Sequence, residues 1–357
     1  GPAGLHADRV RGSLKVEGRH YRTLWVAEDG WSVEIIDQTR LPGEFSVSRL
    51  CTLEDGVRAI RTMQVRGAPL IGVAAAYGVC LALRQDPADQ ALEAACRALE
   101  ATRPTAVNLC WALDRMGTVL REIPAGDRVE AAYRVAAKLA DEDVAINERI
   151  GLHGERILRE LLARKPDRPL HILTHCNAGW LATVDWGTAL APVYRGHDAG
   201  LPVHVWVSET RPRNQGFLTA WELAQHGVPH TVIVDSAAGL LLRQGRVDVV
   251  LVGADRVTRM GDVANKVGTY LKALAAREAG VPFYVAAPSP SIDWSLANSD
   301  LIPIEERDPR EVHADPQIPV HNPAFDLTPA RLVTGLLTER GVCAASEAGL
   351  HQVFPRA

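Results

Sequence analysis

The sequence is poor in the features that mark secreted, metal-binding and nucleotide-binding proteins. Its six cysteines are dispersed over 357 residues without a C-x-x-C pair, which argues against a disulfide framework and favours reduced thiols. No H-E-x-x-H or cluster of His and Cys occurs, so we expect no catalytic metal and no other cofactor. No G-x-x-x-x-G-K-[ST] occurs, and no G-x-G-x-x-G follows the first strand expected after residue 165, so nucleotide binding through a glycine-rich turn has no support.

The sequence also lacks an excess of charge and a long apolar run. The net charge of −4 and the sequence pI near 6.3 give no reason to expect binding to nucleic acid or to a membrane. No apolar stretch approaches the length that spans a bilayer, and the N-terminus lacks the layout of a secretion signal, so we expect a cytoplasmic protein. A content of 47% hydrophobic and 23% charged residues is typical of a globular chain of this length with two domains.

Residues 1–163 are predicted to form a small domain of short strands followed by helices. The region from Tyr21 to Pro42 alternates apolar and polar residues around Glu28-Asp29-Gly30, which predicts a hairpin. From Thr52 onward the apolar spacing becomes helical, in four main segments: Leu70 to Arg84, Ala88 to Ala101, Thr105 to Glu122 and Asp127 to Leu162.

Residues 164–357 are predicted to form a second, α/β domain. Short apolar runs alternate with helix-like segments, and the runs begin at Leu170, Val203, His230, Val247 and Pro282. This rhythm indicates a Rossmann-like, doubly wound parallel sheet with helices on both faces. The segment from Asn322 to Gly341 is predicted to be a loop followed by an amphipathic helix that ends at Gly341.

Polar side chains follow all five predicted strands. They are His175-Cys176-Asn177, Ser208 to Arg211, Asp235-Ser236, Gly253 to Arg256 and Ala287 to Ser289. Because ligands of open parallel sheets bind beyond the carboxyl ends of the strands, these residues predict a catalytic or polar-ligand site at one edge.

Cys176 is the reactive candidate in this set. It lies between an apolar strand and a small-residue turn, Ala178-Gly179, that leads into a predicted helix. Backbone N–H groups and the positive end of a helix dipole would favour its thiolate. The alternative is that Cys176 is a buried small hydrophobe, as free cysteines commonly are.

Three further segments are candidates for anion binding. Arg66-Gly67-Ala68-Pro69 and Arg103-Pro104-Thr105 each introduce a predicted helix, and the segment GDVANKVGTY supplies Asn265 and Lys266. Each alone is explained as a helix cap or a solvated charge. Several of them in a chain with a reactive thiol indicate a phosphorylated small molecule as ligand.

Nine segments in this order resemble the methylthioribose-1-phosphate isomerases. They are RGAPLIGVAAAYGV, RPTAVNL, THCNAG, ETRP, the pair Gln215-Gly216, LTAWEL, GADRV, GDVANKVGTY and NPAFDLTP. These enzymes share a family with ribose-1,5-bisphosphate isomerases and with the alpha, beta and delta regulatory subunits of translation initiation factor 2B. The resemblance implies an aldose–ketose isomerase of methionine salvage that acts on a small phosphorylated pentose as a homodimer. It also implies that Cys176 and Asp255 are catalytic and that the substrate is bound by Arg66, Gly67, Ala68, Arg103, Gln215, Asn265 and Lys266.

The chemistry of these residues is consistent with that implication. A sugar phosphorylated on its anomeric oxygen cannot open spontaneously, so ring opening needs an acid, and Asp255 at the mouth of an apolar strand can keep a raised pKa. Cys176 then either removes the C2 proton or assists a direct hydride shift, and both routes stay open. Arg66, Arg103 and Lys266 would hold the C1 phosphate.

The sequence leaves open the substrate, the class of protein and the place of two tryptophans. The substrate is 5-methylthioribose 1-phosphate, or it is a sugar that differs at C5, such as 5-deoxyribose 1-phosphate or ribose 1,5-bisphosphate. A non-catalytic regulatory subunit is the alternative from another class, although such a subunit has no chemical use for Cys176 and Asp255 together. Trp180 and Trp186 either fill a helix–sheet interface, which we favour, or line the pocket around C5.

Overall fold

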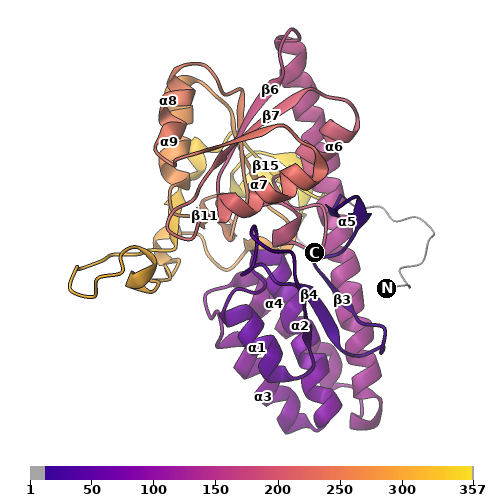
Figure 1. Cartoon of the computed structure of the whole chain (residues 1–357). Helices are drawn as coiled ribbons and strands as arrows, with labels where there is room; N and C mark the ends of the chain where they lie inside the picture. Colours follow the sequence, from indigo (N-terminus) through magenta and orange to yellow (C-terminus); the bar gives the residue numbers. More distant parts are fainter. Residues whose placement is uncertain (1–12, 356–357) are drawn as a thin grey trace.

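The computed structural model describes residues 13–355, so the first 12 residues of the predicted N-terminal domain and the last two of the chain lie outside it. A smaller N-terminal domain of short strands and helices lies below a domain built on a large sheet (Figure 1). The predicted fold class, a Rossmann-like sheet domain with a smaller N-terminal domain of strands and helices, is confirmed.

The predicted N-terminal hairpin is present. Strands β3 (Leu24–Val26) and β4 (Val33–Ile36) pair antiparallel around a turn in which Gly30 has a φ of +80°. The sequence did not reveal that β5 (Val47–Leu50) completes a three-stranded sheet, nor that β1 (Lys15–Val16) and β2 (Arg19–His20) form a separate pair. One face of β4 is fully buried against the helices that follow.

Five helices complete this part of the chain. They are α1 (Leu53–Arg61), α2 (Ala68–Gln85), α3 (Asp89–Glu100), α4 (Val107–Arg121) and α5 (Ala125–Arg164). Among the described residues, α2 is the one helix long and apolar enough to cross a membrane, so the prediction that no stretch approaches that length was wrong. Its apolar window is 83% buried, because α1, α3, α4 and α5 pack around it, as befits a core helix.

Helix α5 is 40 residues long and contacts both domains. It packs against α2 and α4 on one side and against α6 (Ala191–Asp198) and the large sheet on the other. Arg164, its last residue, is followed after a short link by the first strand of that sheet.

The seven-stranded sheet has the order β16-β15-β12-β9-β6-β7-β8. The five predicted strands are β6 (Leu170–Thr174), β7 (Val203–Ser208), β8 (His230–Ile233), β9 (Val249–Val252) and β12 (Phe283–Ala286), and all of them pair in parallel. Helices α5, α6 and α7 (Gln215–His226) cover one face, whereas α8 (Ala237–Arg243) and α9 (Thr269–Ala279) cover the other. Alternate residues of β9 face the two cores, which explains why each strand is apolar throughout.

The order of the strands identifies the switch point of the sheet. From β6 the chain proceeds outward through β7 and β8, then returns to β9 on the other side of β6 and continues to β12. The direction of winding therefore reverses between β6 and β9, and ligands of such sheets bind beyond the strands at this switch point. Cys176 follows β6 and Asp255 follows β9, so the two predicted catalytic residues flank it.

The helix predicted to end at Gly341 does not exist. The segment forms β14 (Phe325–Thr328), a short 3-10 turn, β15 (Gly335–Thr338) and β16 (Gly341–Cys343), and the last helix, α10 (Glu347–Val353), comes later. β15 is buried throughout and pairs with β12, and a short run of apolar residues has no periodicity that separates such a strand from a buried helix. β14 joins β10 (Arg256–Thr258), β11 (Val263–Lys266) and β13 (Ile292–Asp293) in a second sheet.

Candidate active site

Cys176 lies in a strained loop at the end of β6. Its φ is +64°, and Thr210 after β7 has a φ of +65°, which is rare for a β-branched residue. The Cys176 N–H donates to Thr210 Oγ1 at 2.7 Å, and Thr219 Oγ1 on α7 donates to the Cys176 carbonyl at 2.8 Å. Such conformations persist only where the surroundings impose them, and they are concentrated in functional sites.

The helix predicted after Gly179 is a 3-10 turn of three residues, Trp180–Ala182, and the next α-helix begins at Ala191. The prediction that a helix dipole directly behind Cys176 favours its thiolate was therefore wrong. Positive charge near Cys176 comes from side chains instead. Burial lowers the pKa of both Arg66 and Lys266, and for each the largest opposing contribution is the negative charge of Cys176.

Asp255 shares this environment. Burial raises the pKa of its carboxyl, as the sequence predicts, while the positive charges of Lys266, Arg103 and Arg66 oppose that shift. The fold therefore brings predicted residues of both domains into electrostatic contact: Arg66, Arg103, Asp255 and Lys266 interact with one another, and Cys176 interacts with Arg66 and Lys266.

Arg66 and Gly67 connect this cluster to the start of α2. Arg66 Nη1 donates to Asn177 Oδ1 at 2.7 Å, and its Nη2 donates to the Asn177 carbonyl at 2.9 Å, so Arg66 is held against the residue that follows Cys176. Gly67 is the N-cap of α2 and supplies no side-chain cap, and Ala68 is the first helical residue. Uncapped N–H groups at a helix start attract an anion.

Two small cavities lie beside the Arg66-Gly67 pair, since Gly67 lines one and Arg66 lines the other. The first, of about 50 Å³, is lined by Gly67, Ala68, Ile71, Arg103, Thr105, Ala106, Val107, Asp255, Arg256, Ala264, Ile302, Pro303 and Phe325. The second, of about 220 Å³, is lined by Gln38, Thr39, Leu41, Pro42, Met63, Arg66, Arg213, Asn214, Gln215, Phe217 and Leu218. A larger, open hollow of about 650 Å³ near Trp294 and Arg340 contains none of the predicted site residues.

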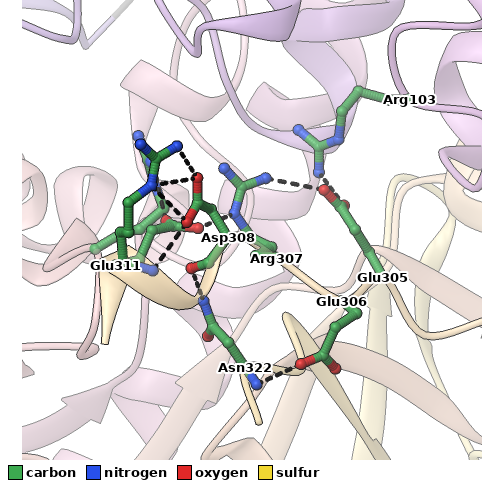
Figure 2. A network of polar contacts seen from close by, with 9 residues as sticks. Arg103, Glu305, Glu306, Arg307, Asp308, Glu311 and Asn322 are labelled. Atoms are coloured by element: carbon green, nitrogen blue, oxygen red, sulfur yellow. Dashed lines mark hydrogen bonds and ion pairs between the residues drawn. The ribbon is translucent and has the colours of Figure 1, made fainter. Parts of the chain in front are cut away.

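Arg103 is held by a network that the sequence did not reveal. Figure 2 shows Glu305 accepting from Arg103 Nη2 at 3.1 Å and from Arg307 at 2.9 Å, while Arg307 also donates to Glu311 at 2.8 Å. Glu311 in turn accepts from Arg213 at 3.0 Å. Glu305, Arg307 and Glu311 lie in the insertion between β13 and β14, and the Arg103 Nε–H is buried without a partner among the described residues. The insertion thus orients Arg103 and leaves one donor for a ligand.

The remaining predicted residues differ in placement. Gln215, the first residue of α7, is buried, and its Oε1 has no partner among the described residues. Lys266 Nζ lies 4.9 Å from the centre of the Phe325 ring, beside the first cavity. Asn265 lines neither cavity, and its amide donates to Thr269 Oγ1 at the start of α9.

Trp180 and Trp186 fill the protein interior, as we favour from the sequence. Trp180 is fully buried and packs against Trp221 of α7 and Tyr194 of α6, and Trp186 is 7% exposed. Neither lines the two cavities. Residues 13–355 contain no group of three or more His, Cys, Asp or Glu side chains placed to hold a metal ion.

Gly67→Ala should destabilise the protein by about 2–4 kcal/mol, from left-handed strain and overpacking together. Gly67 has a φ of +99°, and a Cβ there would lie 2.5 Å from Ala182 Cα. Gly30→Ala is the matched control, since Gly30 also has a positive φ but a Cβ there meets nothing within 4 Å, and it should cost about 1–2 kcal/mol. Urea unfolding measures the free energy of unfolding of both variants. If both lose the same stability, the turn at Ala182 moves aside at no energetic cost, which would contradict the prediction.

Taken together, the fold and the site define an α/β protein with a strained cysteine, a buried carboxyl and buried cationic side chains at the switch point of a parallel sheet. Residues 64–345 match the model of the Initiation factor 2 subunit family. The chain belongs to this family.

Similar proteins include enzymes and translation factor subunits. The methylthioribose-1-phosphate isomerases of Rhodospirillum centenum and Escherichia coli are 59% and 54% identical to this chain, each over 96% of both chains. The crystal structure of 5-methylthioribose 1-phosphate isomerase from Pyrococcus horikoshii is 42% identical and superposes with a TM-score of 0.84, over 94% of this chain and 96% of that one. Subunit delta of translation initiation factor eIF-2B from A. fulgidus is 38% identical with a TM-score of 0.80, over 94% of this chain and 100% of that one.

Proposed function

We propose that the protein converts 5-methylthioribose 1-phosphate into 5-methylthioribulose 1-phosphate by intramolecular isomerisation. The observation that supports the proposal is that Cys176 and Asp255 follow the two strands flanking the switch point and that both interact electrostatically with Arg66 and Lys266. Relatives 54–59% identical over nearly the full chain are named for this reaction, which supports the same choice.

The proposed mechanism begins with binding of the C1 phosphate by the three cationic side chains and the start of α2. Asp255, whose pKa is raised by burial, acts in its acid form and gives its proton to the ring oxygen as the bond from that oxygen to C1 breaks. In one route the Cys176 thiolate removes the proton from C2, a double bond forms between C1 and C2, and the thiol returns a proton to C1. In the other, the C2 hydrogen moves to C1 as hydride while Cys176 assists. In both routes the C2 hydroxyl then gives its proton to the Asp255 carboxylate, which restores the acid and leaves a ketone at C2 and an intact phosphate ester at C1.

The first cavity favours an apolar group at C5. Most of its lining residues are apolar, among them Ile71, Val107, Ile302 and Phe325. Neither of its two guanidinium groups is left for a second phosphate, because Arg103 is assigned to the C1 phosphate and Arg256 pairs with Asp293 and the Thr105 carbonyl. A thioether fits these surroundings better than a second phosphate does, which argues against ribose 1,5-bisphosphate.

The test is turnover of three sugars by the purified chain, followed by NMR. We expect 5-methylthioribose 1-phosphate to give the ketose fastest, 5-deoxyribose 1-phosphate more slowly and ribose 1,5-bisphosphate not at all. Fastest turnover of the bisphosphate would overturn the substrate assignment. Turnover of none would favour a non-catalytic regulatory subunit.

We further propose that the protein acts as a homodimer in the cytoplasm. Apolar side chains are exposed along the edge strand β8 and the neighbouring helices α8 and α9: Val232 40%, Val234 59%, Leu240 56% and Leu271 70%. An open, apolar sheet edge is usually covered in the assembled protein. Sedimentation equilibrium should give twice the chain mass of 38.7 kDa, and a monomer would contradict the dimer. The free cysteines suit a reducing compartment, which cell fractionation tests.

A further inference from the structure

A buried carboxylate on α7 braces the loop that carries Cys176. Glu222 is 0% exposed. It accepts four hydrogen bonds, from Asn177 Nδ2 at 2.9 Å, the Trp180 N–H at 2.9 Å, the Leu181 N–H at 3.3 Å and the Tyr194 hydroxyl at 2.7 Å. Gly179 passes so close that a Cβ there would lie 1.5 Å from Glu222 Oε1. The loop is therefore built around this carboxylate.

One of these bonds determines how Asn177 faces Arg66. An asparagine amide can in principle be reversed, which exchanges its oxygen with its NH2 group. Here Nδ2 donates to both Glu222 Oε2 and Thr219 Oγ1, so Oδ1 is turned toward Arg66 Nη1, which donates to it at 2.7 Å. Both Glu222 oxygens already accept from other donors, Oε1 from the Trp180 N–H and the Tyr194 hydroxyl and Oε2 from the Leu181 N–H. Glu222 therefore faces Asn177 as an acceptor, permits this orientation of the amide and opposes the reversed one.

We propose that Glu222 is a positioning residue that fixes Arg66 for the substrate phosphate through Asn177. This inference rests on the proposed function, in which Arg66 binds that phosphate. If Glu222 cannot accept from Asn177, the amide loses the contact that orients it. A reversed amide would direct an NH2 group at the guanidinium, which has only donors, and Arg66 would leave its place.

The decisive experiment exchanges donor and acceptor between positions 177 and 222. Glu222→Gln places an NH2 group against the Asn177 NH2, and Asn177→Asp places two carboxylates together. Each single variant should weaken binding of inorganic phosphate about 10-fold and lower kcat/KM about 10- to 100-fold, the range for residues that orient a binding group. The double variant Glu222→Gln with Asn177→Asp restores one donor facing one acceptor and leaves an oxygen for Arg66. It should recover both quantities to within about threefold of wild type.

Tyr194→Phe is the matched control, since it removes another donor to Glu222 without touching Asn177. It should lower the thermal unfolding temperature but leave phosphate binding within about twofold. Titration followed by ³¹P NMR measures phosphate binding independently of turnover. If wild type binds phosphate but isomerises none of the sugars, the proposed function fails while the exchange experiment still tests Glu222. A double variant no better than the single ones, or a Tyr194→Phe variant as impaired in binding as Glu222→Gln, would overturn the inference.

Discussion

Replacing Cys176 by alanine should lower turnover of 5-methylthioribose 1-phosphate about 10⁴-fold, the upper range for loss of a group that transfers a proton in the transition state. Cys176 lies at the switch point, in a strained backbone conformation that is held by hydrogen bonds to Thr210 and Thr219. It also interacts electrostatically with Arg66 and Lys266. The lost group contributes chemistry and little ground-state binding, so kcat should fall while inorganic phosphate still binds. NMR assays of the ketose and of phosphate binding check both.

Cys96→Ala on α3 is the control for removal of a thiol and should keep full activity. Substrate deuterated at C2 then separates the two routes. Proton abstraction by the thiolate allows the label to exchange with solvent, whereas a direct hydride shift carries it to C1. A Cys176→Ala variant within tenfold of wild type would remove this cysteine from the mechanism.

Replacing Asp255 by asparagine should lower kcat/KM about 10²- to 10⁴-fold, because the amide cannot protonate the ring oxygen. The sign of the pH dependence follows from burial, which raises the pKa of this carboxyl. The acid form is the active one, so it is fully present below the raised pKa and is lost as the pH rises through it. The wild-type profile of kcat/KM should therefore decline toward alkaline pH, and the residual activity of the variant should lack that decline.

Glu222 provides the control for this profile. It is another buried carboxyl near the site, and burial raises its pKa to about 7 although its hydrogen bonds oppose the shift. Glu222→Gln should be slower than wild type but should keep the alkaline decline. If the decline disappears in that variant and persists in Asp255→Asn, the acid is not Asp255.

The fold could be predicted wherever the apolar pattern was long or strictly repeated. The five parallel strands and the main helices have such patterns, and the hairpin at Gly30 has a turn signal. The segment after Asn322 was mispredicted because β15 is four buried residues, Gly-Leu-Leu-Thr, that owe their conformation to pairing with β12, a partner about 50 positions away. β10 and β11 escaped notice because they are short and lie among charged residues.

The candidate site could be predicted in part for the same reason. Cys176 and Asp255 directly follow apolar strands, and parallel strands bring their carboxyl ends together whatever the loops do. The partners that orient the cations could not be predicted, since Glu305 contacts Arg103 across 202 positions and Glu222 contacts Asn177 across 45. The charges of Glu305 and Arg307 were visible in the sequence, but such a run usually forms a solvated loop.

Helix α5 also limits how the molecule can be divided. Our proposed domain boundary at residue 163 lies at its C-terminal end, yet its roughly 60 Å of length supports the helical layer at one end and the sheet at the other. A C-terminal fragment that begins after residue 163 would lack α5 and would leave the surfaces of α6 and β15 that α5 covers exposed. The two halves are therefore interdependent folding partners, and a split version of this protein should work only when both pieces are present to reassemble.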